Sequence, residues 1–395
     1  MTYHILDAAS LRDWLAQQPD LSERLGGEAA EWSIREVSDG NLNTVFLLHG
    51  AVGALCCKQA LPHVRVAPDW PMPLERALYE SRYMQTVAPA VPGLMPEFLA
   101  YDADLFLIVM ECLTAHEVLR SALIADRALP GFSAVIGTYI ARTVQATGWV
   151  NQPFETGARL LEQFSGNTAL TRITVDLILT DPYRVCDRNP EPEAGLREDV
   201  KALQNDQNLH QAVGRLQERF LTARQALLHG DLHTGSIMLD GSDVRVIDGE
   251  FATTGPVGFD CGLYLGNLAL HLCAVPHKAA FLRDEMLAFW QSFSTELRSS
   301  LSKEGGDQWA LSGPAARQDL IETFLHDILR DTAGFCGLEM IRRTVGFAQV
   351  ADYGVCSTEK DRLLARQKAL QIGRTLVVQG ASLRSFADIL SLMGL

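Results

Sequence analysis

The stretch Leu228-His-Gly-Asp-Leu-His-Thr-Gly-Ser236, followed by Asp248-Gly-Glu250, decides the fold class of this chain. Two short apolar runs lie between these segments, and Asp240-Gly241 between the runs is typical of a β-hairpin turn. A hairpin returns the chain to its start, so we expect Asp231 and Asp248 to lie near one another. The sequence therefore predicts three carboxylates, including that of Glu250, within reach of one point.

Such a group of carboxylates suits a magnesium ion and a general base. Magnesium prefers hard oxygen ligands in octahedral geometry, and substrate phosphates commonly complete its shell. Phosphoryl transfer requires an acceptor hydroxyl positioned by a carboxylate, and metal ions that neutralise the transferring group. The spacing follows the kinase pattern H-R-D-x-x-x-x-N with D-F-G beyond it, here with His229-Gly-Asp231, Ser236 and Asp248-Gly-Glu250. The joint spacing favours this chemistry over a set of unrelated turn residues.

The first third of the chain supplies an independent indication. Residues before about 30 have helical spacing that ends at Gly26-Gly27, and residues 32–60 have the texture of short strands. A helix is predicted from Leu74 to about Val87, after Pro73, and a buried strand over Leu105–Cys112. Small strands followed by a helix and another strand are what a nucleotide-binding lobe needs.

Candidate nucleotide contacts follow one another in the expected order. Ser38-Asp-Gly-Asn-Leu-Asn43 lies between two strands, Lys58 ends a strand, and Glu80 lies on the following helix. A lysine near phosphates is effective only if it is held in place, which an ion pair with Glu80 would do. The strand ending in Met110-Glu-Cys-Leu113 would be the hinge that offers backbone groups to adenine. No Walker A string is present, which disfavours a P-loop enzyme.

The rest of the chain predicts a helical lobe. Residues 262–395 have almost wholly helical patterns, and residues 187–196 read as a loop. We therefore predict an α+β, two-lobed, protein kinase-like fold. Residues 1–113 would form an ATP-binding N-terminal lobe with the hinge at its end, and residues 114–395 a helical C-terminal lobe with the catalytic loop and the substrate site.

Composition excludes several other classes of protein. The 395 residues include 47% hydrophobic and 21% charged residues, which is too apolar for a disordered chain. The net charge of −14 makes nonspecific binding to nucleic acid unfavourable. No signal peptide or run of about 18 apolar residues is evident, so we expect no membrane partner. Eight cysteines without CxxC spacing indicate reduced thiols in a cytoplasmic protein.

Six segments between residues 39 and 350 resemble the 5-methylthioribose kinase family of the aminoglycoside-phosphotransferase-like, protein kinase-like superfamily. They are Asp39–Asn43, Lys58–Val66, Trp70–Met72, His229–Ser236, Gly255–Asp260 and Met340–Val350. The catalytic loop alone indicates the superfamily. The run from Lys58, the His233-Thr-Gly-Ser236 ending and the arginine pair of the last segment are specific to the family.

The resemblance implies a role for each matching residue in the nucleotide site. Lys58 and Asn41 would contact ATP phosphates, and Glu80 would orient Lys58. Asp248, Gly249 and Glu250 would form the metal-bearing turn, with magnesium held by Asp248 and Glu250. The adenine hinge would be Glu111, Cys112 and Leu113.

On the substrate side, the resemblance implies that Asp231 accepts the proton of the sugar 1-hydroxyl and also binds the substrate. His233, Arg342 and Arg343 would bind the substrate too, or stabilise charge on the γ-phosphate. Two adjacent helical residues diverge by about 100°, so we expect only one of the arginines to dominate. The resemblance also implies a homodimer.

Some positions depart from the family pattern. Gly249 stands where the family usually has proline, and glycine should loosen the metal-bearing turn while leaving both carboxylates in place. Cys56-Cys57 and Cys112 differ from the usual residues. Ser236 replaces the asparagine of the superfamily, but this serine matches the narrower family. These departures bear on the acceptor substrate more than on ATP.

The resulting hypothesis is ATP-dependent phosphorylation of S-methyl-5-thioribose, in methionine salvage. An alternative is a kinase of another small alcohol or sugar, as in aminoglycoside or choline kinases, although an arginine pair disfavours a cationic acceptor. A catalytically inactive nucleotide-binding protein is disfavoured, because it would not need all five of the charged residues Lys58, Glu80, Asp231, Asp248 and Glu250. A metallohydrolase built on His229, Asp231 and His233 would need further ligands, for which only His271 and His277 offer themselves.

Overall fold

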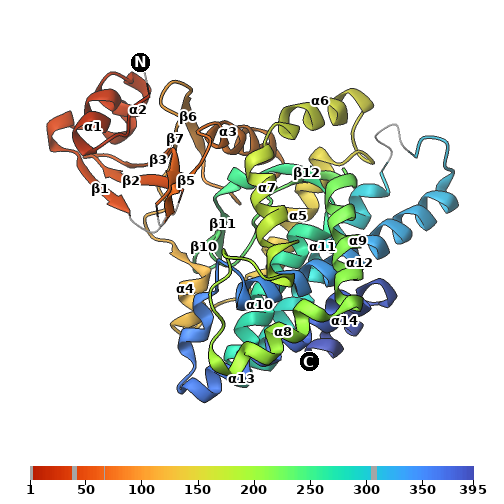
Figure 1. Cartoon of the computed structure of the whole chain (residues 1–395). Helices are drawn as coiled ribbons and strands as arrows, with labels where there is room; N and C mark the ends of the chain where they lie inside the picture. The colour runs from red at the N-terminus through yellow and green to blue at the C-terminus, as the bar shows by residue number, and fades with distance from the viewer. Residues whose placement is uncertain (1–2, 38–41, 66, 304–308) are drawn as a thin grey trace. The chain divides into compact units, whose positions relative to one another are not determined.

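The computed structural model describes residues 3–37, 42–65, 67–303 and 309–395. The chain divides into two compact units (Figure 1). The first unit comprises residues 1–116 and 245–252, and the second unit comprises residues 117–244 and 253–395. The first is rich in strands and the second is largely helical, which confirms the predicted α+β, kinase-like fold class.

An antiparallel five-stranded sheet forms the centre of the first unit. Its order is β1 (Ser33–Val37), β2 (Asn43–His49), β3 (Ala54–Ala60), β7 (Leu107–Glu111) and β6 (Phe98–Asp102). The smaller elements of the unit are β4 (His63–Val64), β5 (Ala67–Pro71), and the 3-10 turns η1 (Ala29–Glu31), η2 (Ala88–Ala90) and η5 (Gly249–Phe251). The predicted strands are therefore present. β7 starts at Leu107, later than expected, since Phe106 adopts a positive φ of 49° that interrupts the extended backbone.

The two faces of this sheet are covered by different helices. Helices α1 (Ala8–Ala16) and α2 (Pro19–Leu25) pack on one face, where Leu11 and Trp14 join Cys57 in a buried core. Side chains alternate along a strand, so Lys58 points to the opposite face. That face carries helix α3 (Arg76–Val87), which the sequence predicted. This alternation places Lys58 of β3 on the same face of the sheet as α3, the helix that carries Glu80.

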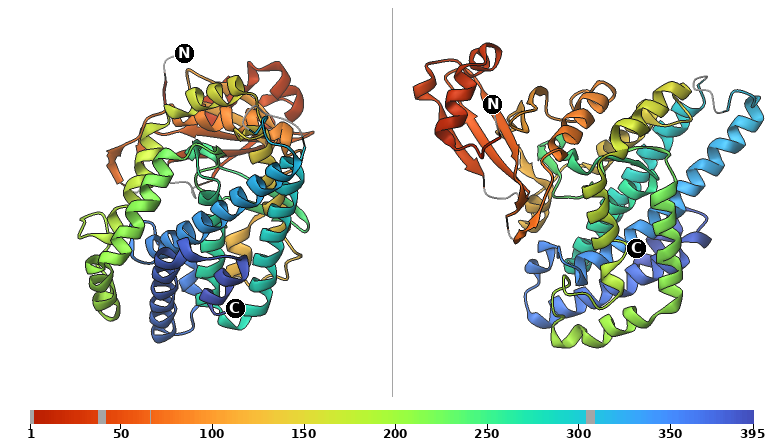
Figure 2. Two further views of the ribbon diagram at one scale, coloured as in Figure 1. Left: turned by 90° about the vertical axis from the view of Figure 1, so that its right-hand side faces the viewer. Right: turned by 45° about the horizontal axis from the view of Figure 1, so that its top comes forward.

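The second unit is built around two central helices, α10 (Gly258–Ala274) and α12 (Pro314–Val345), which lie side by side in Figures 1 and 2. Its other helices are α4 (Leu119–Ile124), α5 (Ser133–Thr147), α6 (Phe154–Ser165), α7 (Thr168–Leu177), α8 (Arg197–Asn205), α9 (Gln207–Thr222), α11 (Ala279–Leu301), α13 (Glu359–Gln379) and α14 (Phe386–Met393). Short 3-10 turns are η3 (Asp181–Tyr183), η4 (Ala194–Leu196), η6 (Pro276–Lys278), η7 (Ala351–Val355) and η8 (Gly380–Ser382). The predicted helical character of residues 262–395 is confirmed, and the predicted loop over 187–196 ends in η4.

Close contact between α10 and α12 depends on small residues. A Cβ atom at Gly262 would lie 2.7 Å from the backbone nitrogen of Cys336, and one at Gly266 would lie 2.9 Å from the Cβ of Glu339. Neither distance is compatible with a larger residue, so these glycines let the two backbones approach. The same contact fixes Glu339 in the interior, one turn before the arginine pair.

The predicted hairpin is also present. It pairs β10 (Ile237–Asp240) with β11 (Asp243–Val246), and Gly241 begins the turn with φ 55°. In the second unit, β8 (Glu117–Val118) extends this pairing through β10, and β9 (Ala226–Leu228) pairs with β12 (Thr253–Gly255). Leu228, the last residue of β9, lies opposite Thr253, the first residue of β12. The segment that begins with the catalytic loop and ends with η5 therefore starts and finishes at this strand pair.

Within the described residues, no single helix has the length and apolarity needed to cross a membrane. One bent pair, α10 followed by Pro276–Leu301 at an angle of 119°, meets both requirements only when its two parts are taken together.

Candidate active site

Lys58 is the centre of a charged cluster in the first unit. Its Nζ lies 2.7–2.8 Å from the two carboxylate oxygens of Glu80 and also donates to Asp248 Oδ1. Burial alone would lower the pKa of Lys58, but the carboxylates of Asp248, Glu80 and Glu250 raise it above its ordinary value. Burial raises the pKa of Glu80 to about 7, although Lys58 opposes this shift. The ion pair expected between strand and helix therefore exists and keeps the lysine charged.

The turn that carries Asp248 and Glu250 has an unusual backbone. Asp248 adopts a left-handed conformation with φ 72°, which aspartate tolerates better than most residues. Gly249 follows, and a Cβ atom there would lie 2.5 Å from Cδ1 of the buried Tyr83 ring. Helix α3 thus packs directly against Gly249, and a larger residue here would require the turn or the Tyr83 ring to move. The expectation of a loosened turn stays a prediction.

Glu250 is held by two residues that sequence reasoning did not select. Asn43 Nδ2 donates to Glu250 Oε2 at 3.0 Å, and Arg76 Nε lies 3.3 Å from the same oxygen. The Arg76 guanidinium is fully buried and also donates to the carbonyl oxygens of Pro73, at 2.7 Å, and of Leu42. Asn43 belongs to the segment Asp39–Asn43 that resembles the family, so the sequence could have indicated it. Nothing in the sequence marks Arg76 as buried.

The carboxylates of this cluster form a candidate metal centre. One oxygen each from Glu80, Asp248 and Glu250 lie within 4.8 Å of one another. Hard oxygen ligands of this kind suit magnesium, and the three negative charges exceed the two positive charges of Lys58 and Arg76. The predicted ligands Asp248 and Glu250 thus lie together, with Glu80 as a neighbour engaged by Lys58.

The predicted hinge residues Glu111, Cys112 and Leu113 are half-buried at the end of β7. The Glu111 backbone N–H donates to the carbonyl of Glu97 at 2.9 Å, and its carboxylate accepts from Arg245 at 3.3 Å. The Glu111 side chain therefore fastens the strand end rather than facing outward. Asn41 lies outside the described residues, and its contact with ATP phosphates stays a prediction.

The catalytic loop of the second unit is fixed by its own hydrogen bonds. The backbone N–H groups of His229 and Gly230 donate to the carboxylate of Asp260, at 2.7 and 3.0 Å, and Gly230 has φ 84°. The buried Ser236 hydroxyl accepts the His233 N–H at 2.9 Å and lies 3.0 Å from the carbonyl of Asp231. Ser236 thus closes the loop on itself. Asp260 belonged to a segment that resembled the family, but its structural task was not predicted.

Asp231 lies among three nitrogen-bearing side chains. His233 Nε2 is 3.3 Å from Asp231 Oδ2, and a terminal nitrogen of Arg342 is 3.3 Å from Oδ1, with one of Arg343 at 3.9 Å. Burial would raise the pKa of Asp231, but His233 and the arginines hold it well below its usual range. Asp231 is therefore ionised and able to accept a hydrogen bond.

His233 has a defined tautomer in this arrangement. Its Nδ1 accepts the backbone N–H of Gly235 at 2.9 Å, so the proton of the neutral ring resides on Nε2, which faces Asp231. Burial lowers the pKa of His233, which favours this neutral form. His233 thus donates to Asp231.

The expectation that one arginine dominates stays a prediction, but both approach the same Asp231 oxygen, Arg342 at 3.3 Å and Arg343 at 3.9 Å. The reason is Glu339, a fully buried residue that sequence reasoning missed. It accepts Nε of Arg342 at 2.5 Å and Nε of Arg343 at 2.9 Å. Its spacing of three and four residues before the arginines could have indicated it.

Asp231 belongs to the second unit and Asp248 to the first, so their expected proximity stays a prediction. Each unit nevertheless brings together a set of the predicted residues. The first joins Lys58 and Glu80 to the acidic turn, and the second joins Asp231 and His233 to both arginines.

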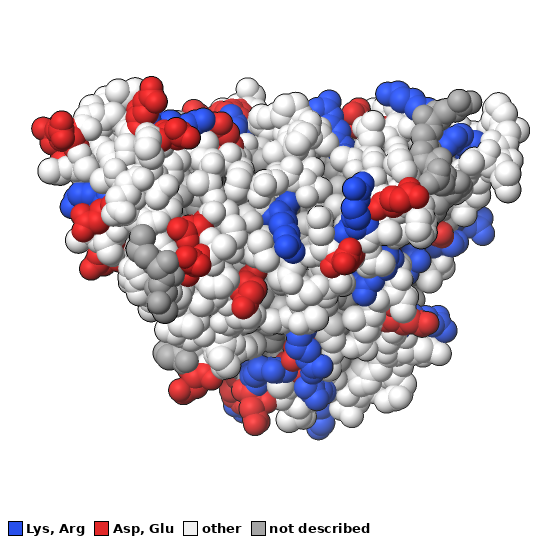
Figure 3. Space-filling view, turned by 90° about the horizontal axis from the view of Figure 1, so that it is seen from above, with Lys and Arg blue, Asp and Glu red and all other residues white. Residues whose placement is uncertain are grey.

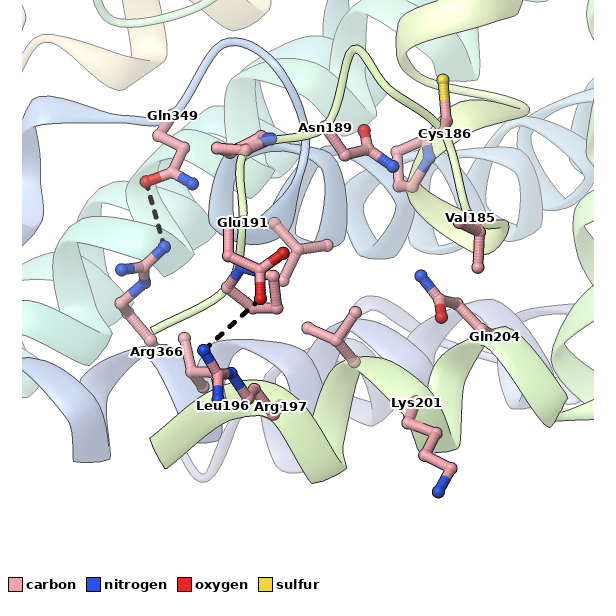
Figure 4. Close-up of a pocket in the computed structure, with 15 residues that line it drawn as sticks. Val185, Cys186, Asn189, Glu191, Leu196, Arg197, Lys201, Gln204, Gln349 and Arg366 are labelled. Atoms are coloured by element: carbon pink, nitrogen blue, oxygen red, sulfur yellow. Dashed lines mark hydrogen bonds and ion pairs between the residues drawn. The ribbon is translucent and has the colours of Figure 1, made fainter. Parts of the chain in front are cut away.

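A separate pocket of about 340 Å³ lies in the second unit (Figure 4). It is bounded by the loop after η3 and by α8, with α12 and α13 behind. Arg366 is paired with Glu193 at 3.1 Å and Gln349 at 3.0 Å, and Arg197 with Glu191 at 3.5 Å. Within the described part of the chain, none of the residues predicted for catalysis, ATP or substrate lines this pocket.

On the face drawn in Figure 3, acidic and basic side chains are interspersed, so that face offers no continuous basic stripe for a polyanion.

Comparison with known proteins places these observations in a family. Residues 33–291 match the phosphotransferase enzyme family known as APH. A methylthioribose kinase of Geobacillus sp. (strain WCH70) is 37% identical over 381 residues, which cover 94% of this chain and 93% of that protein. One of Yersinia enterocolitica is 35% identical over 401 residues and covers 98% of both.

A third relative, the methylthioribose kinase of Pectobacterium atrosepticum, is 39% identical over 358 residues and covers 87% of both chains. Among solved structures, an ethanolamine kinase of Plasmodium vivax aligns with a TM-score of 0.48 at 11% identity, over 93% of this chain and 90% of that one. The extent of the matches to the methylthioribose kinases, together with the clusters around Lys58 and Asp231, leads to one conclusion. This chain belongs to the methylthioribose kinase family of phosphotransferases.

Proposed function

We propose that this chain is an ATP-dependent methylthioribose kinase, which transfers the γ-phosphoryl group of ATP to the 1-hydroxyl of S-methyl-5-thioribose. The products are S-methyl-5-thioribose 1-phosphate and ADP. The observation that carries the proposal is the ionised Asp231, set between the neutral His233 and two arginines. The relatives named methylthioribose kinase supply the identity of the acceptor.

Asp231 would receive the acceptor hydroxyl. An ionised carboxylate accepts the hydroxyl hydrogen bond, orients the oxygen toward phosphorus and takes its proton as the new O–P bond forms. Arg342 and Arg343 would stabilise the negative charge on the transferring group. The His233 Nε2–H would hold the carboxylate in orientation. These three side chains and Asp231 are the substrate-side residues of the proposal.

The first unit would bind ATP. Lys58, kept charged by Glu80, would contact the phosphates together with Asn41, and backbone groups of Glu111, Cys112 and Leu113 would contact adenine. Asp248 and Glu250, on either side of Gly249, would hold magnesium, which neutralises phosphate charge when bound. The acidic excess of this cluster supports the metal assignment, because two buried carboxylates and the exposed one of Asp248 lie together and outnumber the cations Lys58 and Arg76.

The alternative acceptors can be weighed by charge. A choline or aminoglycoside site must compensate a cationic substrate with carboxylates or aromatic faces. Here the side chains that contact Asp231 are His233 and two guanidiniums, and none of the three attracts a cationic substrate. A neutral sugar with several hydroxyls needs no such compensation and can accept hydrogen bonds from both arginines.

An ATP-consumption screen tests the proposal. ADP formation is measured with methylthioribose, ribose, choline and an aminoglycoside, each with magnesium and with excess chelator, and phosphorus NMR identifies the product. We expect turnover with methylthioribose only, loss of turnover with chelator, and a 1-phosphate product. Faster turnover of choline or an aminoglycoside, or turnover unaffected by chelator, would contradict it.

The setting of the enzyme is also proposed. Phosphorylation of methylthioribose places the chain in methionine salvage, as the names of the relatives imply. The eight cysteines are all free thiols, which supports a reducing compartment such as the cytoplasm. The family resemblance supports a homodimer, and a sedimentation mass equal to one chain would contradict it.

A further inference from the structure

Glu339 occupies a special place on α12. Its side chain is fully buried, and it lies one helical turn before the arginine pair. One carboxylate oxygen, Oε2, accepts Nε of Arg342 at 2.5 Å, and the other, Oε1, accepts Nε of Arg343 at 2.9 Å. Each oxygen thus engages one arginine.

These two hydrogen bonds to Glu339 explain how the adjacent residues Arg342 and Arg343 both approach Asp231. Side chains at successive helical positions diverge by about 100°, but a residue three and four positions earlier neighbours both. Because both arginines give their Nε to Glu339, a terminal nitrogen of each can extend toward Asp231. These nitrogens lie 3.3 Å (Arg342) and 3.9 Å (Arg343) from Asp231 Oδ1. The other terminal nitrogen of Arg343, Nη1, donates to the carbonyl of Ala348 at 3.4 Å.

A second layer of hydrogen bonds fixes Glu339 itself. Asn267 Nδ2 donates to Glu339 Oε1 at 2.8 Å, and its side-chain oxygen Oδ1 accepts from a terminal nitrogen of Arg120 at 2.7 Å. Gly266 allows α10 to approach closely enough for this contact. Burial would raise the pKa of Glu339, but the two arginines lower it to about 2, so the residue is ionised.

We propose that Glu339 is the positioning residue of the arginine pair: it aligns both guanidiniums toward Asp231. The inference rests on the proposed function, in which the arginines stabilise charge on the transferred group. Two guanidiniums with Asp231 alone carry a net positive charge and would compete for its oxygens. Glu339 balances the second charge, which leaves Asp231 accessible to the acceptor hydroxyl.

The decisive variant is Glu339→Gln, which keeps the shape but has one acceptor oxygen and presents an NH2 group to a guanidinium. We expect kcat with methylthioribose to fall about 10- to 100-fold, as for other residues that orient catalytic groups, with an unchanged KM for ATP. The arginine double variant R342A/R343A should lose activity too. Adding E339Q to it should cause no further loss, because nothing is left to position.

Glu285→Gln is the matched control. Glu285 is another buried carboxylate of the second unit, and it accepts the backbone N–H groups of Phe132 and Ser133 at 3.1 and 2.9 Å. E285Q should lower thermal stability without changing kcat. Parent kcat in a folded E339Q, or a loss that adds fully to that of R342A/R343A, would overturn the proposal.

Two further measurements keep the test decisive. If E339Q fails to fold, Asn267→Ala replaces it, and we expect at least a threefold fall in kcat; parent kcat would overturn the proposal. Hydrogen exchange of the arginine Nε–H groups, followed by NMR in the parent and assigned with R342K and R343K, requires no substrate. Two slowly exchanging signals are expected, and rapid exchange of both would overturn the proposed hydrogen bonds of Glu339 to the arginines. Failure of the proposed function would instead appear as a parent protein that keeps these signals but does not phosphorylate methylthioribose.

Discussion

Gly249→Ala is the substitution whose cost follows most directly from the structure. A Cβ atom at this position would lie 2.5 Å from Cδ1 and 3.0 Å from Cε1 of Tyr83. Ordinary carbon contacts are about 3.5–4.0 Å, so the turn or the ring must move by about 1 Å. Tyr83 is fully buried beside the turn, so its ring is surrounded by protein atoms. Overpacking of this kind costs about 1–3 kcal/mol, or roughly 4–12 °C in Tm for a unit of this size.

The same displacement should impair catalysis, because the residues on either side of Gly249 are the proposed metal ligands. A shift of about 1 Å at a positioned group can cost about 100-fold in rate. We therefore expect kcat/KM for ATP to fall about 10- to 100-fold in G249A, with a higher magnesium requirement. The larger ring of proline at this position should have a greater effect, unless Tyr83 is shortened as well.

The assay combines thermal unfolding with steady-state kinetics at several magnesium concentrations. Gly214→Ala is the control, since Gly214 lies in α9 with no atom within 4 Å of its Cβ position. Glycine inside a helix is less stable than alanine by about 1 kcal/mol, so G214A should raise Tm slightly and leave the kinetics unchanged. A G249A enzyme with parent Tm and parent kcat/KM would refute the packing argument.

Further predictions concern the charged residues themselves. Asp231→Asn should lower kcat by about 10³-fold or more while ATP affinity, measured by calorimetry, stays near that of the parent. Lys58→Met should raise the KM for ATP and destabilise the protein by about 3–5 kcal/mol in urea unfolding, because it leaves buried carboxylates without their cation. The pKa of Glu339, about 2 in the folded state against an ordinary 4.5, makes its contribution to stability full above pH 4.5 and lost as the pH falls toward 2. The difference in unfolding free energy between the parent and E339Q should therefore shrink over that range; a constant difference would contradict it.

Much of the fold was accessible from sequence because local patterns agree with the tertiary structure. Short segments of strand texture predicted β2 and β3, and two apolar runs beside Asp240-Gly241 predicted the hairpin. The pair Gly26-Gly27 predicted the end of α2, where both glycines have positive φ. Strands β9 and β12, of three residues each, were not predicted. Such short pairings are specified by their partners rather than by their own composition, and no periodicity can develop over three residues.

The site divides in the same way. Residues that carry chemistry stood out by type and spacing, as Lys58, Asp231 and the arginine pair did. Residues that hold them in place did not. Arg76 and Glu339 look like surface charges on helices, and only the packing of α3 and α12 shows that both are fully buried. Burial of a charged residue depends on the neighbours that other segments supply, which a single sequence does not display.

These supporting charges bear on why the sites are built as they are. Replacing a buried ion pair with apolar residues is often neutral or stabilising, so buried charge clusters are not the most economical way to hold a fold together. Yet one such cluster surrounds Lys58 and another surrounds Asp231, each with a buried carboxylate, Glu80 or Glu339, that pairs with its basic residues. Ion pairs formed before any ligand binds keep catalytic groups in place without reorganisation during the reaction. Both partners are then best understood as fixed supports for a positive charge, and replacing either should reduce turnover more than stability would suggest.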